Sequence, residues 1–138
     1  MYKTILYNAQ DGVTTLTLNR PDKYNAFNQE MGEEFLAALE AVKNDTSCRV
    51  VVVSGAGKSF CSGQDLSEVE NSDIKLSEIL HNRYNPIIKA LRNLPLPIIG
   101  KINGVAAGAG CSLALACDFL VASEKASLIE VFINIGLV

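Results

Sequence analysis

Two segments of small and polar residues could direct backbone N–H groups at a negatively charged oxygen. They are residues 60–66, which contain Gly63, and residues 103–110, which contain Gly108 and Ala109. The second segment is expected to open a helix, and the first amides of a helix have no partner inside it. One donor from each segment could stabilise the enolate of a thioester, and loss of one such donor typically costs about 10²- to 10³-fold in rate.

Small side chains are needed at these positions for this chemistry. A bulky residue in place of Gly63, Gly108 or Ala109 would keep a substrate from approaching the backbone. The sequence therefore predicts a site where the two segments meet.

The sequence matches two nucleotide-binding motifs only in part and lacks the serine hydrolase motif. Residues 53–59 end in Gly-Lys-Ser, yet a phosphate-binding loop needs a glycine where Val52 stands. Gly108-Ala109-Gly110 resembles the start of a dinucleotide fingerprint until Leu113 takes the place of the third glycine. The pattern G-x-S-x-G of serine hydrolases is absent. Nucleotide binding and serine hydrolysis are therefore disfavoured.

The elements that must position these segments alternate between strands and helices. Alternating apolar residues around Asp11-Gly12 predict a hairpin, and apolar residues at helical spacing predict two amphipathic helices, the second kinked at Pro86. The interval between the third strand pattern and the second helix is expected to be a polar loop. The strands are expected at residues 2–7, 13–18, 50–53, 98–102 and 119–122, the helices at 31–42, 76–91 and about 110–117, and the loop at 56–72. The class is α/β.

The composition indicates one globular domain without a nucleic-acid or membrane partner. The chain has 138 residues, 49% of them hydrophobic, and a net charge of −3. The uncharged stretch between Lys101 and Asp118 is short for a bilayer span of about 20 residues and is expected in the core. The chain has four cysteines without a C-x-x-C pair and one histidine, His81, which predicts free thiols and no metal site. The free thiols and the absence of a secretory signal predict a cytoplasmic location.

Three blocks together resemble the signature of the crotonase (enoyl-CoA hydratase/isomerase) family. They are residues 19–27, residues 60–66, and residues 103–111 followed by Cys117-Asp118, in the family's order. Tyr84-Asn85-Pro86 with residues 104–110 looks most like the ring-epoxide isomerase branch of bacterial phenylacetate degradation. The resemblance implies a crotonase-like ββα superhelix, of which residues 1–138 would be the N-terminal part, about half of the family's length.

The resemblance also assigns the site. It implies that the amides of Gln64 and Ala109 form an oxyanion hole, with coenzyme A as part of the substrate and no separate cofactor. The substrate-binding residues that it implies are Lys23, Tyr24, Ala26, Ser62, Gly63, Gln64, Asp65, Leu66 and Gly108. Lys23 could instead be a solvated lysine of a turn. Asp65 and Asp118 are expected to organise their loops rather than to catalyse.

The reaction depends on where the carboxylates lie. The resemblance implies that hydratases carry two glutamates at the positions of Ser112 and Phe132, whereas an isomerase needs one carboxylate. That carboxylate is expected just beyond Val138, and Glu130 is the acid nearest to this end. An enoyl-CoA isomerase is therefore the favoured hypothesis. An enoyl-CoA hydratase and a non-catalytic acyl-CoA-binding module remain as alternatives, and the resemblance implies a homotrimer or hexamer.

Overall fold

Two sheets make up the framework of the chain. The computed structural model describes residues 1–68 and 75–136 and confirms the α/β class. In the first sheet β1 (Ile5–Gln10) and β2 (Val13–Leu18) are antiparallel, and β3 (Val50–Gly55), β5 (Ile98–Ile102) and β7 (Phe119–Ala122) continue parallel to β2 in that order. The second sheet is parallel and consists of β4 (Ser59–Cys61), β6 (Val105–Ala107) and β8 (Ser127–Ile129).

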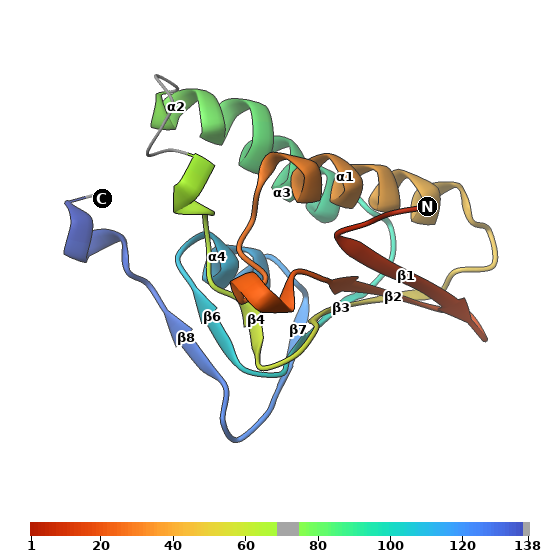
Figure 1. Cartoon of the computed structure of the whole chain (residues 1–138). Coiled ribbons are helices and arrows are strands. Elements are labelled where there is room, and N and C mark those ends of the chain that lie inside the picture. Colours follow the sequence, from red (N-terminus) through yellow and green to blue (C-terminus); the bar gives the residue numbers. More distant parts are fainter. Residues whose placement is uncertain (69–74, 137–138) are drawn as a thin grey trace.

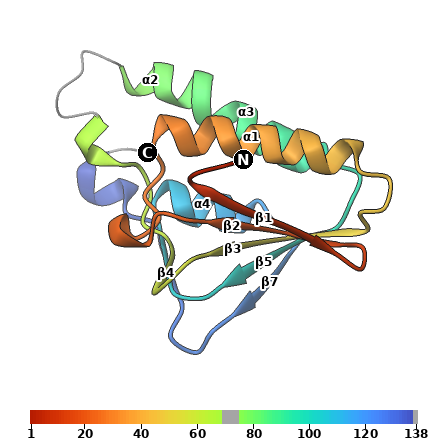
Figure 2. The ribbon, with the colours of Figure 1, turned by 45° about the vertical axis from the view of Figure 1, so that its right-hand side comes forward.

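Helices cover one face of the five-stranded sheet and fill the space beside the second sheet. Figure 2 shows α1 (Gln29–Asn44), α2 (Leu76–Ile79) and α3 (Asn85–Arg92) on the same side of the larger sheet. The short helix α4 (Ala109–Leu115) contacts β4 and β6 of one sheet and β5 of the other (Figure 1). The 3₁₀ turns are η1 (Pro21–Lys23), η2 (Leu66–Glu68) and η4 (Phe132–Ile135).

Helix α1 forms because its start is capped and one of its faces is apolar. The Asn28 side chain accepts a hydrogen bond from the Met31 amide at 2.9 Å, which satisfies one of the free donors of the first turn. Met31, Phe35 and Leu39 are buried in the core against the sheet. The amphipathic helix expected at 31–42 is thus confirmed, with about one further turn.

The second amphipathic helix contains an irregular turn. Between α2 and α3 the chain forms a π-helical turn, η3 (Leu80–Tyr84), in which the Asn85 amide donates to the Leu80 carbonyl five residues earlier. Pro86 follows at once and has no N–H to continue the α-helical pattern. The disturbance expected at Pro86 therefore takes the form of a π-turn just before the proline.

Three expectations about the strands need correction. The first strand is Ile5–Gln10 rather than residues 2–7, because its register is set by pairing with β2. The expected loop at 56–72 contains β4 and η2, although residues 69–74 lie outside the described part, and the glycine-rich segment 103–110 contains β6. Strands of three residues carry too little periodicity to be recognised, and only pairing with each other defines them.

Much of the uncharged stretch is buried, although Val105, Ser112 and Leu115 are exposed, and all four cysteines are buried. The side chains of Ile102, Ala106, Leu113 and Ala114 are buried in the core, as expected for this stretch. Cys48, Cys61, Cys111 and Cys117 are buried free thiols. Within residues 1–68 and 75–136, no helix combines the length and the apolar character that a membrane span requires.

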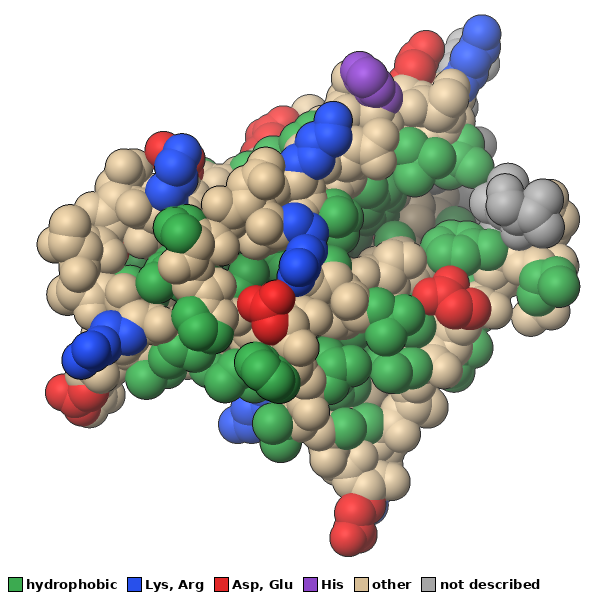
Figure 3. All heavy atoms as spheres, turned by 180° about the vertical axis from the view of Figure 1, so that it is seen from behind, with side chains coloured by type: hydrophobic (Ala, Val, Ile, Leu, Met, Phe, Trp, Pro, Cys, Tyr) green, Lys and Arg blue, Asp and Glu red, His purple; other side chains and the backbone are tan. Residues whose placement is uncertain are grey.

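Apolar side chains are also exposed at one edge of the molecule. Seen from behind, hydrophobic side chains gather on the surface (Figure 3). The exposed ones on the outer strands β7 and β8 include Phe119, Val121, Leu128 and Ile129. The last strand of each sheet therefore presents apolar side chains to solvent.

Candidate functional site

Pairing of β4 with β6 brings the two glycine-containing segments together. The strands align Cys61 with Ala106, so the residues that follow each strand lie side by side. A Cβ built on Gly63 would lie 3.6 Å from the backbone nitrogen of Ala109. The segments expected to form one site therefore meet at the carboxyl ends of two short parallel strands.

The Gln64 amide has a defined direction. The Gly63 carbonyl accepts a hydrogen bond from the Phe27 amide at 2.7 Å, and the Asp65 amide donates to the Phe27 carbonyl at 2.9 Å. In a trans peptide the C=O and N–H groups point to opposite sides. Because the Gly63 carbonyl faces Phe27, the N–H of Gln64 points away from Phe27.

The Ala109 amide is fixed in the same way by α4. The Gly108 carbonyl accepts from the Ser112 amide at 3.0 Å and so points along the helix, which leaves the Ala109 N–H directed out of the helix start. Gly108 has φ +51° and donates its own N–H to the Ile129 carbonyl at 2.9 Å. In the described part of the chain neither the Gln64 nor the Ala109 amide has a hydrogen-bond acceptor. Both donors are free for a ligand.

A largely apolar cavity of about 430 Å³ opens beside these two amides. Its walls come from residues 62–66, from α2, η3 and α3, from α4, and from the start of η4. The lining residues are Phe27, Ser62, Gly63, Gln64, Leu66, Leu76, Leu80, Tyr84, Asn85, Ile87, Ile88, Gly108, Ala109, Ser112, Leu113, Val131 and Phe132. A cavity of this size and character suits an apolar acyl group whose carbonyl end reaches the amides.

The cavity walls contain no carboxylate among the residues described. Ser112 and Phe132, the positions at which the resemblance implies the hydratase glutamates, both line the cavity. Tyr84 is the lining residue with an ionisable side chain, and burial raises the pKa of its phenol well above the ordinary value. The phenol is therefore neutral at physiological pH and acts as a hydrogen-bond donor. A proton acceptor for carbon chemistry has to come from elsewhere.

The two segments expected to bind coenzyme A, residues 23–26 and 62–66, lie next to each other. The Ser62 amide donates to the Tyr24 carbonyl at 3.0 Å, and the Ser62 hydroxyl lies 3.4 Å from the Lys23 carbonyl. The side chains of Lys23, Tyr24 and Leu66 are exposed, whereas Ala26 is buried. These contacts hold η1 beside the Gln64 loop, and the roles of the individual residues remain predictions.

Asp65 organises the loop around Gln64. Its carboxylate pairs with the Arg20 guanidinium at 2.9 Å and accepts from the Ser67 hydroxyl at 2.6 Å. These bonds, that from Ser67 first, lower the pKa of Asp65 below its ordinary value despite partial burial. Arg20 also donates to the Ala26 carbonyl at 2.6 Å. These contacts tie residues 20–26 to the loop that carries the Gln64 amide.

Asp118 and Glu130 are both absent from the lining of the apolar cavity. Asp118 accepts from the Arg92 guanidinium at 2.7 Å and from the Ile98 amide at 2.9 Å, so it joins α3 to the start of β5. Glu130 follows β8, and burial first and then a hydrogen bond with Glu130 raise the pKa of the Cys111 thiol. Neither residue lines the cavity.

Sequence reasoning missed the cluster that surrounds the Gln64 side chain. The Tyr84 hydroxyl donates to Gln64 Oε1 at 2.6 Å, and Arg83 pairs with Glu68 at 2.8 Å. Tyr84 lies within residues 76–91, which the apolar spacing predicted as an amphipathic helix. A buried tyrosine hydroxyl usually has a hydrogen-bond partner, so a tyrosine on the apolar face of this helix could have predicted a nearby polar side chain.

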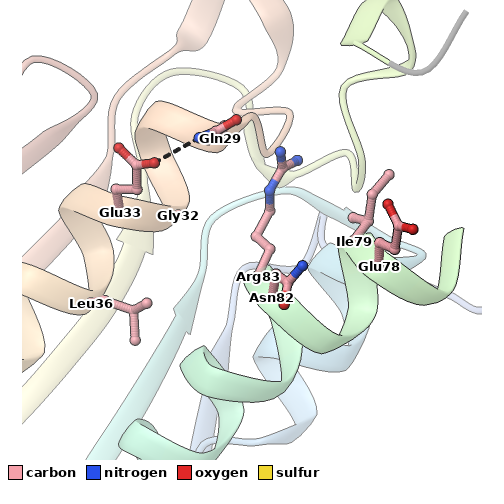
Figure 4. A pocket seen from close by; sticks show the side chains of 8 residues that line it. All are labelled: Gln29, Gly32, Glu33, Leu36, Glu78, Ile79, Asn82 and Arg83. Carbon is pink, nitrogen blue, oxygen red and sulfur yellow. Dashed lines mark hydrogen bonds between the residues drawn. The ribbon is translucent and has the colours of Figure 1, made fainter. Parts of the chain in front are cut away.

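A second cavity, of about 280 Å³, lies between α1 and the α2–η3 segment (Figure 4). Gln29, Gly32, Glu33, Leu36, Glu78, Ile79, Asn82 and Arg83 line it. Its walls mix charged, polar and apolar side chains, and neither the Gln64 nor the Ala109 amide borders it. The apolar cavity beside the free amides is therefore the stronger candidate site.

Comparison with known proteins agrees with this geometry. The model of the enoyl-CoA hydratase/isomerase family matches residues 8–138. The chain is 40% identical over 136 residues to a probable enoyl-CoA hydratase of Rhodobacter capsulatus, covering 99% of the chain and 52% of that protein. It is 41% identical over 143 aligned residues to the 1,2-epoxyphenylacetyl-CoA isomerase of Escherichia coli, covering 100% of the chain and 54% of that protein.

A solved structure supports the same fold. The crystal structure of an enoyl-CoA hydratase/isomerase from Mycobacterium abscessus superposes with a TM-score of 0.90 at 37% sequence identity, over 96% of this chain and 53% of the other. The chain thus spans about half the length of the relatives it matches.

Proposed function

The chain belongs to the enoyl-CoA hydratase/isomerase family, and on that premise we propose that the protein is an enoyl-CoA isomerase. In the proposed reaction a 3-enoyl thioester loses a proton from carbon 2 and regains one at carbon 4. The double bond moves from carbons 3 and 4 to carbons 2 and 3, so atoms and charge balance. The intermediate is a thioester enolate whose oxygen binds the amides of Gln64 and Ala109.

The observation that carries this proposal is the orientation of two peptide planes. The Phe27 amide donates to the Gly63 carbonyl, and the Ser112 amide donates to the Gly108 carbonyl. Each hydrogen bond fixes one peptide plane, so the Gln64 N–H points away from Phe27 and the Ala109 N–H points out of the start of α4. Both N–H groups adjoin the same apolar cavity. Fixed donors in a site shielded from water stabilise a developing oxyanion without having to reorganise during the reaction.

Isomerisation fits the cavity better than hydration does. Adding water to a double bond requires groups that activate the water and deliver its proton, and Ser112 and Phe132 cannot act as such acids. An isomerase can use one carboxylate for both proton transfers. We place this carboxylate in the sequence that follows Val138 in the complete protein, in line with the similarity to the Escherichia coli isomerase.

The test is a pair of assays on the full-length protein. With a 3-enoyl-CoA, isomerisation produces the conjugated 2-enoyl thioester, whose ultraviolet absorbance rises with time. With a 2-enoyl-CoA, hydration removes that absorbance. We expect the first signal to exceed the second at equal substrate concentration. Loss of absorbance from a 2-enoyl-CoA without any isomerisation would establish a hydratase instead.

A binding module without catalysis is the second candidate, because the described cavity has no carboxylate. It predicts saturable binding of hexanoyl-CoA by titration calorimetry and no turnover of either substrate.

The assembly into a homotrimer or hexamer and the cytoplasmic location remain predictions as well. Light scattering after size-exclusion chromatography of the full-length protein measures the oligomeric state, and microscopy of a tagged protein shows its location in the cell.

A further inference from the structure

The side chain of Gln64 is held at all four of its hydrogen-bonding positions. Its Oε1 accepts from the Tyr84 hydroxyl at 2.6 Å and from Arg83 Nη1 at 3.3 Å. Its Nε2 donates to the Asp65 carbonyl at 3.1 Å and to Glu68 Oε2 at 3.3 Å. A carboxamide offers two donors and two acceptor positions, so none is left over. These four contacts hold the Gln64 side chain in its observed orientation.

The same cluster joins three elements that are distant in sequence. Arg83 binds Glu68 at 2.8 Å, and the other oxygen of Glu68 accepts from the Gln29 amide at 2.9 Å, at the start of α1. Gln64 and Glu68 therefore connect the loop that bears the free amide to both α1 and η3. The Arg83 and Glu68 side chains are 14% and 30% exposed, so solvent weakens this pair only in part.

Tyr84 is suited to hold Gln64 because it is fixed and uncharged. Its ring lies 5.9 Å from the ring of Phe27, whose backbone binds both Gly63 and Asp65. The π-helical turn Leu80–Tyr84 ends at this residue. Tyr84 thus contacts Phe27 through its ring and the Gln64 side chain through its hydroxyl.

We propose that Tyr84 is a positioning residue, which acts through the Gln64 side chain to hold the Gln64 amide toward the thioester oxygen. This inference rests on the proposed function, since it assumes that the amide binds that oxygen. Tyr84 also lines the apolar cavity, so an acyl group that fills the cavity presses against the residue that orients the donor. Binding of the acyl group and polarisation of the carbonyl are thereby linked through one hydrogen bond.

The experiment compares wild-type full-length protein with Tyr84→Phe, which keeps the ring and removes the hydroxyl. The probe is hexanoyl-CoA labelled with ¹³C at the thioester carbon, which has no double bond to move. Hydrogen bonds to the thioester oxygen lower its C=O stretching frequency, as measured by difference infrared spectroscopy. We expect a clear lowering in the wild type and a smaller one in Tyr84→Phe.

Kinetics supply the second measurement. We expect kcat for a 3-enoyl-CoA to fall about tenfold in Tyr84→Phe, as loss of one hydrogen bond that acts in the transition state would cause. KM should change by less than about twofold, because the acyl and coenzyme A contacts remain. Gln64→Met removes the same hydrogen bond from the other side, and adding Tyr84→Phe to it should cost little more.

Tyr2→Phe is the matched control, since Tyr2 packs against the ring of Tyr7, away from the cavity. It should leave the carbonyl frequency and kcat unchanged. A wild-type lowering that Tyr84→Phe and Gln64→Met both retain in full, with unchanged kcat, overturns the positioning role alone. No lowering in the wild type overturns the oxyanion site and the positioning role together.

Discussion

Gly63 faces the carbonyl of Ala107 so closely that a Cβ on Gly63 would lie 2.9 Å from the Ala107 oxygen. Gly63 also has φ +101°, a conformation that residues with side chains rarely adopt. The close approach of these two backbones is what brings the Gln64 and Ala109 amides to one cavity. Both the space and the backbone angle at residue 63 therefore require glycine.

Gly63→Ala should lower the free energy of unfolding by about 1–3 kcal/mol and should reduce activity strongly, because the loop must shift away from Ala107. Thermal unfolding and kcat of the full-length protein measure the two effects. Gly57→Ala is the control, since Gly57 also has positive φ, +74°, but lies outside the cavity. A similar loss of kcat in both variants would mean that backbone strain alone, and not the site, explains the result.

Ala109→Pro should remove one oxyanion donor with little effect on the helix. Ala109 is the first residue of α4, where proline is tolerated because the N–H is not used within the helix. We expect kcat to fall by about 10²- to 10³-fold. Ala109→Ser keeps the N–H and serves as the control. If proline leaves the rate unchanged in steady-state assays, the Ala109 amide does not bind the oxyanion.

Gly110→Ala should destabilise the protein although alanine favours helices. A Cβ at residue 110 would lie 2.3 Å from the Cys61 carbonyl oxygen, so α4 would have to move away from β4 at a cost of about 1–3 kcal/mol. In the comparison variant Gly32→Ala, the nearest atom is Arg83 Cγ at 3.0 Å, across the cavity in Figure 4, so the overlap is much smaller. Urea unfolding should show a clearly larger loss of stability for Gly110→Ala than for Gly32→Ala.

Acid should weaken the loop that Asp65 organises. The pKa of Asp65 is lowered by the Ser67 and Arg20 contacts, so the unfolded chain binds this proton more readily than the folded one. The stabilisation is complete above the ordinary value of 3.8 and is lost as the pH falls through the lower pKa of the folded state. Asp65→Asn should cost about 2 kcal/mol at pH 7. Unfolding measured from pH 7 to 2 should show a shallower acid dependence in the variant.

Ser112→Ala should leave isomerisation within about threefold of the wild type, since the hydroxyl supplies no acid or base in the proposed reaction. Ser112 is exposed, so the stability should also change little. Steady-state kinetics with a 3-enoyl-CoA tests this. A drop of about a hundredfold or more would assign Ser112 a part in proton transfer and would reopen the hydratase alternative.

Much of the fold and part of the site could be predicted from the sequence. The β-branched run 50–53 predicted β3, and the spacing of Met31, Phe35 and Leu39 predicted α1, because burial imposes a period on long elements. Residues 60–66 and 103–110 were expected to form one site, and the structure places them side by side. The same patterns gave no indication of β4 or β6.

The sequence pattern by itself thus determined the α/β class, the long helices and strands, and the two segments, 60–66 and 103–110, that form the candidate site. Tertiary structure decided which way the Gln64 and Ala109 amides point, since Phe27 and Ser112 set those peptide planes. It also decided that Tyr84 binds Gln64 and that Glu130 does not line the cavity. The physical reason is that the direction of a backbone donor, and the existence of a three-residue strand, depend on hydrogen bonds to partners that are distant in sequence.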